Sequence, residues 1–226
     1  MIPLRDSLRA RHKPYVNWLL IIINFIVFFG YLGLSQNGLE ELYFRYGVVP
    51  IRVVHLLQTG ASWHLVIIPF ITAMFLHGGW LHIIGNMWYL FIFGDNVEDL
   101  LGHSRYLLFY LITGVIGSLA HVLANAGSPV PIVGASGAIA GVLGGYFLLF
   151  PSARILSLAP FFIFFLVEIP AVFFLAFWFI LQLVNGAVSL GGVANPVAWI
   201  AHVGGFLAGA VLIKLFAPRH SNSLPR

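Results

Sequence analysis

The chain has 226 residues, of which 60% are apolar and only 8% are charged. Soluble globular domains carry about 25% charged residues, so this composition excludes a water-soluble fold. Cysteine is absent, which excludes disulfides, thiolate metal sites and a cysteine nucleophile. The net charge is +4, and because the basic residues border apolar stretches, they indicate orientation in a membrane and not nucleic-acid binding.

Charged residues leave four long gaps, which contain 26, 42, 48 and 45 residues. About 20 apolar residues cross a bilayer as a helix, so each of the last two gaps holds a pair of spans. We therefore expect an all-α polytopic membrane protein with a bundle of six transmembrane helices. The expected spans are roughly residues 16–34, 79–95, 105–124, 132–150, 169–188 and 196–216.

The basic residues predict the orientation of these spans, because Lys and Arg concentrate in cytoplasmic loops. With both termini inside, the outer loops hold only Arg45 and Arg52. The inner segments then hold nine basic residues: Arg5, Arg9, Arg11, Lys13, Arg105, Arg154, Lys214, Arg219 and Arg226. We expect a basic cytoplasmic segment at 1–15, a membrane domain at 16–216 and a cytoplasmic tail at 217–226.

The segment 53–76 is apolar enough to suggest a seventh span. It also contains several polar residues and a proline, and a seventh span would place the C-terminal basic residues outside. We therefore expect residues 35–78 to form a long outer loop that lies partly in the membrane interface.

Four polar residues fall inside the expected spans, near their outer ends: His82, Asn86, Ser136 and His202. Polar groups within a membrane are costly and are functional-site candidates by default. Positions four to seven residues into a helix lie roughly 6 to 10 Å below its start, so these side chains can share one depth. His82 and Asn86 are also four residues apart and share a helix face.

Each of these residues also has a purely structural interpretation. A lone intramembrane serine commonly hydrogen-bonds to its own helix, and a lone histidine or asparagine commonly joins two helices. The placement of all four at one depth on three helices of the same direction favours a catalytic cluster instead.

Small residues recur every four positions around Ser136 and His202. This spacing lets helix backbones approach closely, which would bring the serine hydroxyl within reach of the imidazole. The small residues are Ala140, Gly144, Gly137, Gly141 and Gly145 in span 132–150, and Ala201, Gly205 and Gly209 in span 196–216.

A serine beside a histidine base is an activated nucleophile. Asp95 lies about 20 Å along the helix from His82, and Glu168 lies at the inner entrance of span 169–188, so we expect a Ser-His dyad without a carboxylate. Donors for a developing oxyanion are available from His82, from Asn86 and from the backbone of Gly134 and Ala135. This set of groups fits hydrolysis of a peptide bond inside the membrane.

Other catalytic motifs fit less well. The sequence "GASG" lacks the second glycine of a nucleophile elbow, and His77 and His82 are five residues apart without an H-E-x-x-H pattern. The spans also lack the paired aspartates expected of an intramembrane aspartic protease. We expect no metal and no cofactor.

Three separated motifs resemble the rhomboid family of intramembrane serine proteases. They are "HGGWLHIIGNMWYLFIFGDNVED" from His77, "GASGAIAGVLGGY" from Gly134 and "AHVGGFLAG" from Ala201. The resemblance implies Ser136 as nucleophile and His202 as general base. It further implies His82, Asn86 and the backbone from Gly134 to Ser136 as the oxyanion site, with His77 in support.

The same resemblance implies membrane-protein substrates with one transmembrane segment, cut in or near its outer part. Water would reach the dyad from outside, and span 169–188 together with the outer loops would gate entry. Apart from the resemblance, the sequence shows neither a transit peptide nor an extra soluble domain, which favours the plasma membrane of a prokaryote. The sequence departs from the family pattern at two places, which affects the expected loop packing and substrate preference. Ala140 stands where some relatives have an aromatic residue, and the outer loop lacks the Trp-Arg pair found in many members.

The alternatives are an inactive rhomboid-like protein that binds membrane clients, and a channel whose path includes Gln182 and Asn185.

Overall fold

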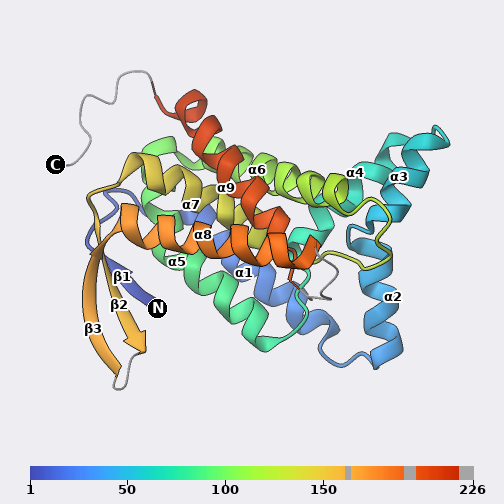
Figure 1. Ribbon diagram of the computed structural model, residues 1–226, viewed down its shortest axis with the longest axis horizontal. Helices are drawn as coiled ribbons and strands as arrows, with labels where there is room; N and C mark the ends of the chain where they lie inside the picture. The colour runs from blue at the N-terminus through green and yellow to red at the C-terminus, as the bar shows by residue number, and fades with distance from the viewer. Residues whose placement is uncertain (161–163, 191–196, 219–226) are drawn as a thin grey trace.

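The computed structural model describes residues 1–160, 164–190 and 197–218 (Figure 1). The chain is mostly helical, as its long stretches without charged residues predict. The helices are α1 (Tyr15–Tyr31), α2 (Gln36–Tyr46), α3 (Pro50–Gln58), α4 (Trp63–Thr72), the short 3-10 helix η1 (Ala73–Phe75), α5 (Trp80–Leu101), α6 (His103–Ala124), α7 (Ser136–Leu149), α8 (Ala171–Leu190) and α9 (Trp199–Phe216).

Three of the described helices, α6, α8 and α9, are long and apolar enough to cross a membrane. A fourth candidate arises if α4 with η1 and α5, which meet at an angle of 87°, are taken as one bent span. The helices α1 and α7 are apolar but shorter, with 17 and 14 residues. Length and composition by themselves thus support three or four spans.

Two expected spans have different ends in the structure. The helix α5 continues past residue 95 to Leu101, so Asp95, Glu98 and Asp99 lie within it. The helix α7 begins only at Ser136, and shortly before it Ile132 forms an isolated β-bridge with Val48. Ser136 is therefore the first residue of its helix and does not lie a turn inside it.

The helix α7 forms the centre of the bundle. Every residue from Gly137 to Tyr146 is buried, and α7 packs against α5, α6 and α9. In Figure 1 the helices α5, α7 and α9 all run from the right-hand end towards the left-hand end. Their first residues therefore meet at one end of the bundle, while both chain termini lie towards the other (Figure 1).

The closest helix contact in the bundle joins α7 to α9 through glycines. A Cβ atom added at Gly205 would overlap the carbonyl oxygen of Gly137, and one added at Gly209 would overlap that of Gly141. The two backbones touch directly, as small residues at four-residue spacing permit. The same region of α9 also contacts α6, where a Cβ at Gly117 would lie 2.6 Å from the carbonyl oxygen of Ala201.

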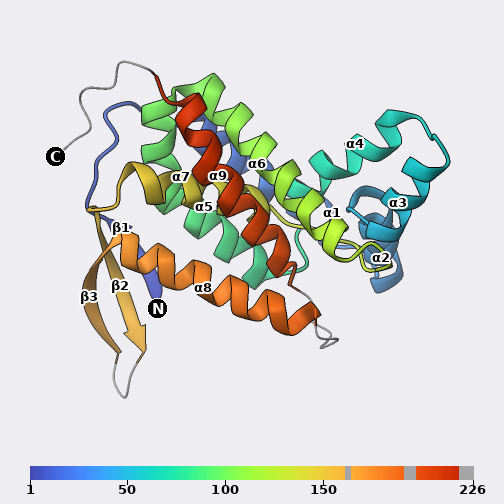
Figure 2. The ribbon, with the colours of Figure 1, turned by 45° about the horizontal axis from the view of Figure 1, so that its top comes forward.

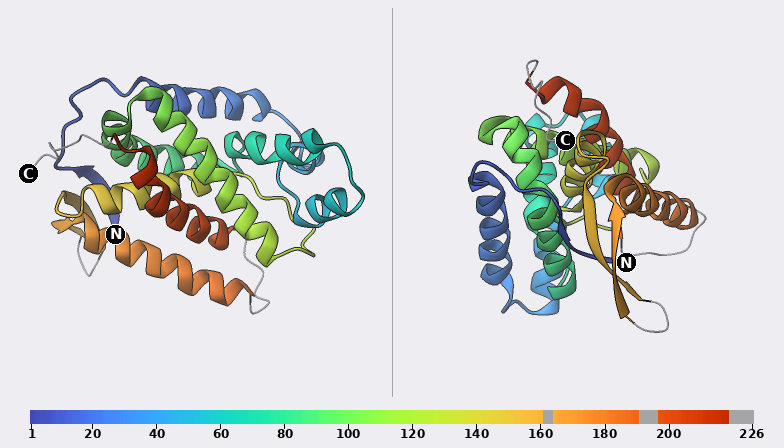
Figure 3. Two further views of the ribbon diagram at one scale, coloured as in Figure 1. Left: turned by 90° about the horizontal axis from the view of Figure 1, so that it is seen from above. Right: turned by 90° about the vertical axis from the view of Figure 1, so that its left-hand side faces the viewer.

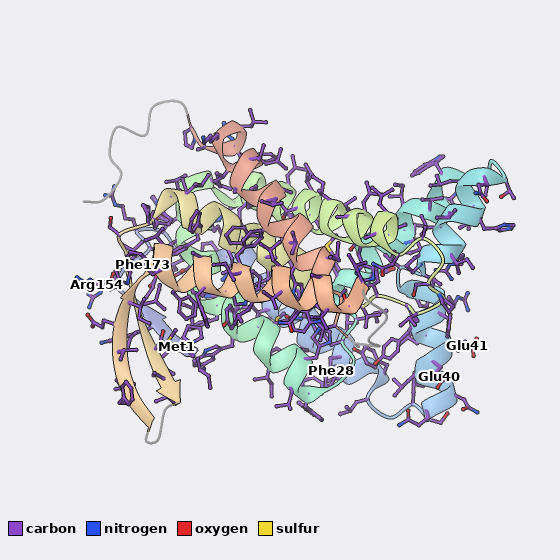
Figure 4. The ribbon with its side chains drawn as sticks, viewed as in Figure 1. Met1, Phe28, Glu40, Glu41, Arg154 and Phe173 are labelled. Atoms are coloured by element: carbon purple, nitrogen blue, oxygen red, sulfur yellow. The ribbon has the colours of Figure 1, made fainter. Side chains whose placement is uncertain are left out.

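The segment 35–78, expected as an outer loop, forms the helices α2, α3 and α4 and the short helix η1. Ser35 caps α2 by accepting a hydrogen bond from the amide of Gly38 at 3.3 Å. Large apolar side chains of α4, such as Trp63, Leu65 and Ile68, are exposed on the surface. In Figure 4 Glu40 and Glu41 mark this end of the molecule, opposite Met1 and Arg154.

A three-stranded antiparallel sheet lies at the end with the termini, so the all-α prediction is wrong for this region. Its strands are β1 (Ile2–Asp6), β2 (Arg154–Pro160) and β3 (Phe164–Pro170), in the order β1-β2-β3. Ile2 pairs with Leu158, and Asp6 pairs with Ile155. The strands β2 and β3 project away from α8 (Figure 3, right). The expected basic segment 1–15 contains the strand β1.

Side chains from the bundle fix this N-terminal segment. The Asp6 carboxylate accepts hydrogen bonds from the Tyr146 hydroxyl at 2.5 Å and from the Asn96 amide at 2.9 Å. The buried Glu98 carboxylate accepts the backbone amides of Val16 and Asn17, at 2.9 and 2.7 Å, and thereby caps the start of α1. Of the predicted tail 217–226, residues 219–226 lie outside the described part of the chain.

Candidate active site

The start of α5 holds two polar side chains on one face. The amide of Gly78 donates a hydrogen bond to Nδ1 of His82 at 3.2 Å, so Nδ1 is the acceptor and Nε2 carries the hydrogen. Asn86 lies one turn further along the same face. The Nδ2 atom of Asn86 is buried and has no hydrogen-bond partner among the described residues.

His77 supports this turn from the preceding residues. Its ring packs edge-on against that of His82, with 5.0 Å between the centroids. Its backbone is fixed by tyrosines: its amide donates to the Tyr31 hydroxyl at 2.7 Å, and its carbonyl accepts from Tyr31 and Tyr43 at 2.9 and 3.0 Å. The position of His82 thus depends on an anchored loop.

The donors of α5 meet the chain just before α7, at Gly134. This residue has φ +127, a conformation that favours glycine. A Cβ atom there would lie 2.7 Å from Nε2 of His82 and 3.6 Å from Nδ2 of Asn86. Its amide donates to the carbonyl of Ala73 at 2.8 Å, which holds the backbone in place. Two side-chain donors therefore converge on the bare backbone two residues before Ser136.

Ser136 begins α7, and Ala135 at the N-cap position makes no side-chain capping bond. The first amides of a helix lack acceptors within the helix and carry a partial positive charge. Ser136 is partly exposed, whereas Ala135 and Gly137 on either side are buried. The serine is therefore accessible at the start of a helix whose next ten residues are buried.

His202 is the fourth residue of α9 and is 8% exposed. Its Nδ1 atom lies 2.9 Å from Oε1 of Gln182 on α8. The ring of Trp178, one turn earlier on α8, stacks on the imidazole at a centroid distance of 6.0 Å, and Trp199 meets it edge-on at 5.9 Å. Three side chains thus hold the imidazole in one orientation.

The contact between α7 and α9 joins these two halves of the site. A Cβ at Gly137 would lie 3.7 Å from the carbonyl oxygen of Ala201, so the residue after Ser136 touches the residue before His202. The structure therefore brings Ser136, His202, His82 and Asn86 to one end of the bundle.

The carboxylates of Glu168 and Asp95 take no part in this arrangement. Glu168 lies in β3, where it pairs with Leu156, and Asp95 lies near the last turns of α5, where its carboxylate accepts a bond from Asn96. Within residues 1–160, 164–190 and 197–218, no three His, Cys, Asp or Glu side chains group as metal ligands do.

The sequence analysis did not identify Gln182 or Trp178 as partners of His202. Gln182 was considered only as part of a channel path. The available signal is the spacing of Trp178, Gln182 and Gly186 at four-residue intervals, which places them on one face of a helix. That spacing marks a packed stripe but does not say which neighbour it packs against.

Comparison with known proteins identifies the family. A model of the rhomboid domain matches residues 63–219, which include α4 to α9 and every residue of the site above. The chain belongs to the rhomboid family. The predicted family resemblance is therefore confirmed.

Three relatives of this rhomboid illustrate the match. RHOMBOID-like protein 6, mitochondrial, of Arabidopsis thaliana is 34% identical over 194 residues, which cover 84% of this chain and 53% of the relative. Rhomboid protease GluP of Bacillus subtilis is 31% identical over an alignment of 203 positions, which covers 88% of this chain and 35% of GluP. Rhomboid-like protein 11, chloroplastic, of Arabidopsis thaliana is 31% identical over an alignment of 230 positions, which covers 97% of this chain and 73% of the relative.

This rhomboid spans about half the length of the first of these relatives and about a third of the second. Rhomboids are generally serine proteases, and one of these relatives is named as a protease.

Proposed function

We propose that this rhomboid is an intramembrane serine endopeptidase that cuts membrane proteins in or near their transmembrane segments. The observation that carries the proposal is the pair of donors at Gly134. Leaving a buried donor without an acceptor costs about 1–3 kcal/mol, yet Nδ2 of Asn86 is buried without a partner in the described structure and Nε2 of His82 faces the same spot. An oxyanion that exists only during catalysis is the acceptor that fits them.

The proposed reaction uses Ser136 and His202 as a dyad. The Ser136 hydroxyl attacks the scissile carbonyl carbon while its proton passes to Nε2 of His202. The carbonyl oxygen takes up the negative charge beside Nε2 of His82, Nδ2 of Asn86 and the backbone of Gly134 and Ala135. His202 then gives the proton to the leaving amine, and a water molecule, activated by the same base, hydrolyses the acyl-enzyme. No metal or cofactor is needed for these steps.

We further propose that α1, α5, α6, α7, α8 and α9 are the six spans, with both termini in the cytoplasm. The charge distribution supports this orientation, because nine basic residues then lie inside and two outside. The starts of α5, α7 and α9 lie at the end of the bundle opposite the termini (Figure 1). The dyad would then open to the extracytoplasmic side of the cell membrane, where water can reach it.

Labelling with a fluorophosphonate probe tests the proposal. The purified wild-type protein in detergent should react at a single serine, and Ser136→Ala and His202→Ala should each abolish labelling while the thermal unfolding curve is retained. Ser118→Ala is the matched control, because Ser118 is a buried serine of α6 outside the site. Labelling that survives in Ser136→Ala, or a folded wild type that does not react, would refute the dyad and favour a client-binding role.

A further inference from the structure

The helix α8 lies along one side of the bundle, with α9 beside it (Figure 2). Most of its large apolar side chains are exposed, and Phe173 is 67% exposed. Its buried residues are Ala171, Phe174, Leu175, Gln182 and Gly186. Spacings of three, four and seven residues place them on one face, so α8 is attached to the bundle through a single stripe.

Gln182 is the polar member of that stripe, and both ends of its amide are used. Nε2 donates to the Trp178 carbonyl at 3.0 Å, and Oε1 lies 2.9 Å from Nδ1 of His202. The bond to Trp178 fixes which end of the amide faces the imidazole. Because an amide oxygen only accepts, Nδ1 of His202 must carry the hydrogen, and Nε2 is left with the lone pair.

We propose that Gln182 is a positioning residue that sets the tautomer and orientation of His202, so that the base is competent only while α8 packs against α9. The inference rests on the proposed serine protease function. In that function a lone pair on Nε2 of His202 is what accepts the Ser136 proton. Trp178 on the same helix adds the stacked ring, so a displacement of α8 removes two of the three side chains that hold the base.

Two substitutions on α8 distinguish the proposed effect on His202 from the loss of a hydrogen bond within α8 itself. Gln182→Leu removes the acceptor for His202, whereas Asn185→Leu removes a bond of the same local kind, since Nδ2 of Asn185 donates to the carbonyl of Leu181 at 2.7 Å. We expect Gln182→Leu to lower the rate constant for fluorophosphonate labelling about 10- to 100-fold, as loss of a buried hydrogen-bond partner does. Asn185→Leu should stay within about twofold of the wild type, because Asn185 is only partly buried and lies outside the stripe that attaches α8 to the bundle.

The kinetic signature distinguishes positioning from a loss of packing. With a peptide substrate, Gln182→Leu should lower kcat and leave KM unchanged, and Gln182→Glu, which retains an oxygen acceptor, should restore part of kcat. A Gln182→Leu variant with unchanged kcat would overturn the proposal. A fall in both the folded fraction and kcat that Gln182→Glu does not relieve would also overturn it, because that pattern indicates packing alone.

A tether tests the dependence on α8 directly. A Cβ atom at Gly186 would lie 3.7 Å from Cβ of Trp199, within the range of about 3.5–4.5 Å that a disulfide needs. The chain has no other cysteine, so Gly186→Cys/Trp199→Cys gives one defined cross-link between α8 and the start of α9. Comparing the oxidised and reduced forms of this one variant removes the effect of the lost indole.

We expect the oxidised form to label with the fluorophosphonate at least as fast as the reduced form, because the tether keeps α8 against the base. Labelling that requires reduction would overturn the proposal, since it would mean that the competent base forms with α8 displaced. The two proposals fail separately: a folded wild type that does not label refutes the dyad, whereas a labelled wild type with an unaffected Gln182→Leu refutes only the role of Gln182.

Discussion

The direct backbone contact between α7 and α9 predicts that Gly209→Ala damages both stability and activity. A Cβ at Gly209 would overlap the carbonyl oxygen of Gly141 and would lie 2.6 and 2.7 Å from its carbonyl carbon and Cα. All three are backbone atoms, so a side-chain rotation cannot relieve the contact. The helices must instead separate by about 1 Å. Overpacking of this kind costs about 1–3 kcal/mol of stability.

The control is Gly30→Ala in α1, where an added Cβ meets nothing within 4 Å. There the substitution should stabilise the protein by about 0.4–1 kcal/mol, because it restricts the unfolded chain. Unfolding free energies in detergent should therefore shift in opposite directions for the two variants, with a difference of about 1.5–4 kcal/mol.

The same displacement acts on the proposed dyad. His202 lies two turns before Gly209 on α9, and Ser136 lies at the start of the facing helix. A misplacement of about 1 Å between reacting groups can cost about 100-fold in rate, so Gly209→Ala should label with fluorophosphonate far more slowly than Gly30→Ala. A Gly209→Ala protein as stable and as reactive as Gly30→Ala would refute the close contact.

Three further predictions follow from the site and the N-terminal segment. Asn86→Ala should lower kcat about 10²- to 10³-fold, as loss of one oxyanion donor does, while Asn185→Ala should not; equal kcat values for these two variants would exclude Asn86 as a donor. Burial raises the pKa of Asp6 to about 6, so β1 binds the bundle most tightly when Asp6 is protonated, and this stabilisation should decline as the pH rises from about 4 through 6. Hydrogen exchange of the backbone amides in residues 2–6, corrected for intrinsic rates, should therefore be slower at pH 5 than at pH 7. Asp6→Asn keeps the contacts to Asn96 and Tyr146 but removes the charge facing Asp95, so it should abolish this difference. In the cysteine-free chain, an impermeant maleimide should label Asn37→Cys on intact cells and Arg9→Cys only after lysis. The reverse pattern would show that the protein has the opposite orientation in the membrane.

The sequence predicts the bundle well where one physical signal dominates. The long gaps between charged residues locate α6, α8 and α9, and the spacing of small residues around Ser136 anticipates a close approach that Gly137 and Gly205 make. The candidate site follows from the same reasoning, because His82, Asn86, Ser136 and His202 are polar residues that a membrane otherwise excludes.

Other features depend on contacts that local sequence does not encode. The strand β1 has few residues and pairs with a segment far along the chain. Its local sequence therefore does not distinguish it from the rest of the basic segment 1–15. The role of Gln182 depends on which helix faces α8, and its spacing is equally compatible with a contact to lipid or to another helix. The start of α7 at Ser136 comes shortly after the bridge between Val48 and Ile132, which joins residues that are far apart in the chain.

The pairing of β1 with β2 also fixes an order of events during synthesis. Ile2 leaves the ribosome near the start of translation, but its partner Leu158 follows only after roughly 150 more residues, or about 8–30 s at typical rates. The start of α1 waits as well, because Glu98, the acceptor for its first amides, lies 81 residues beyond Asn17. The start of α1 is therefore secured once Glu98 has been made, whereas β1 stays unpaired until β2 follows in the second half of the chain.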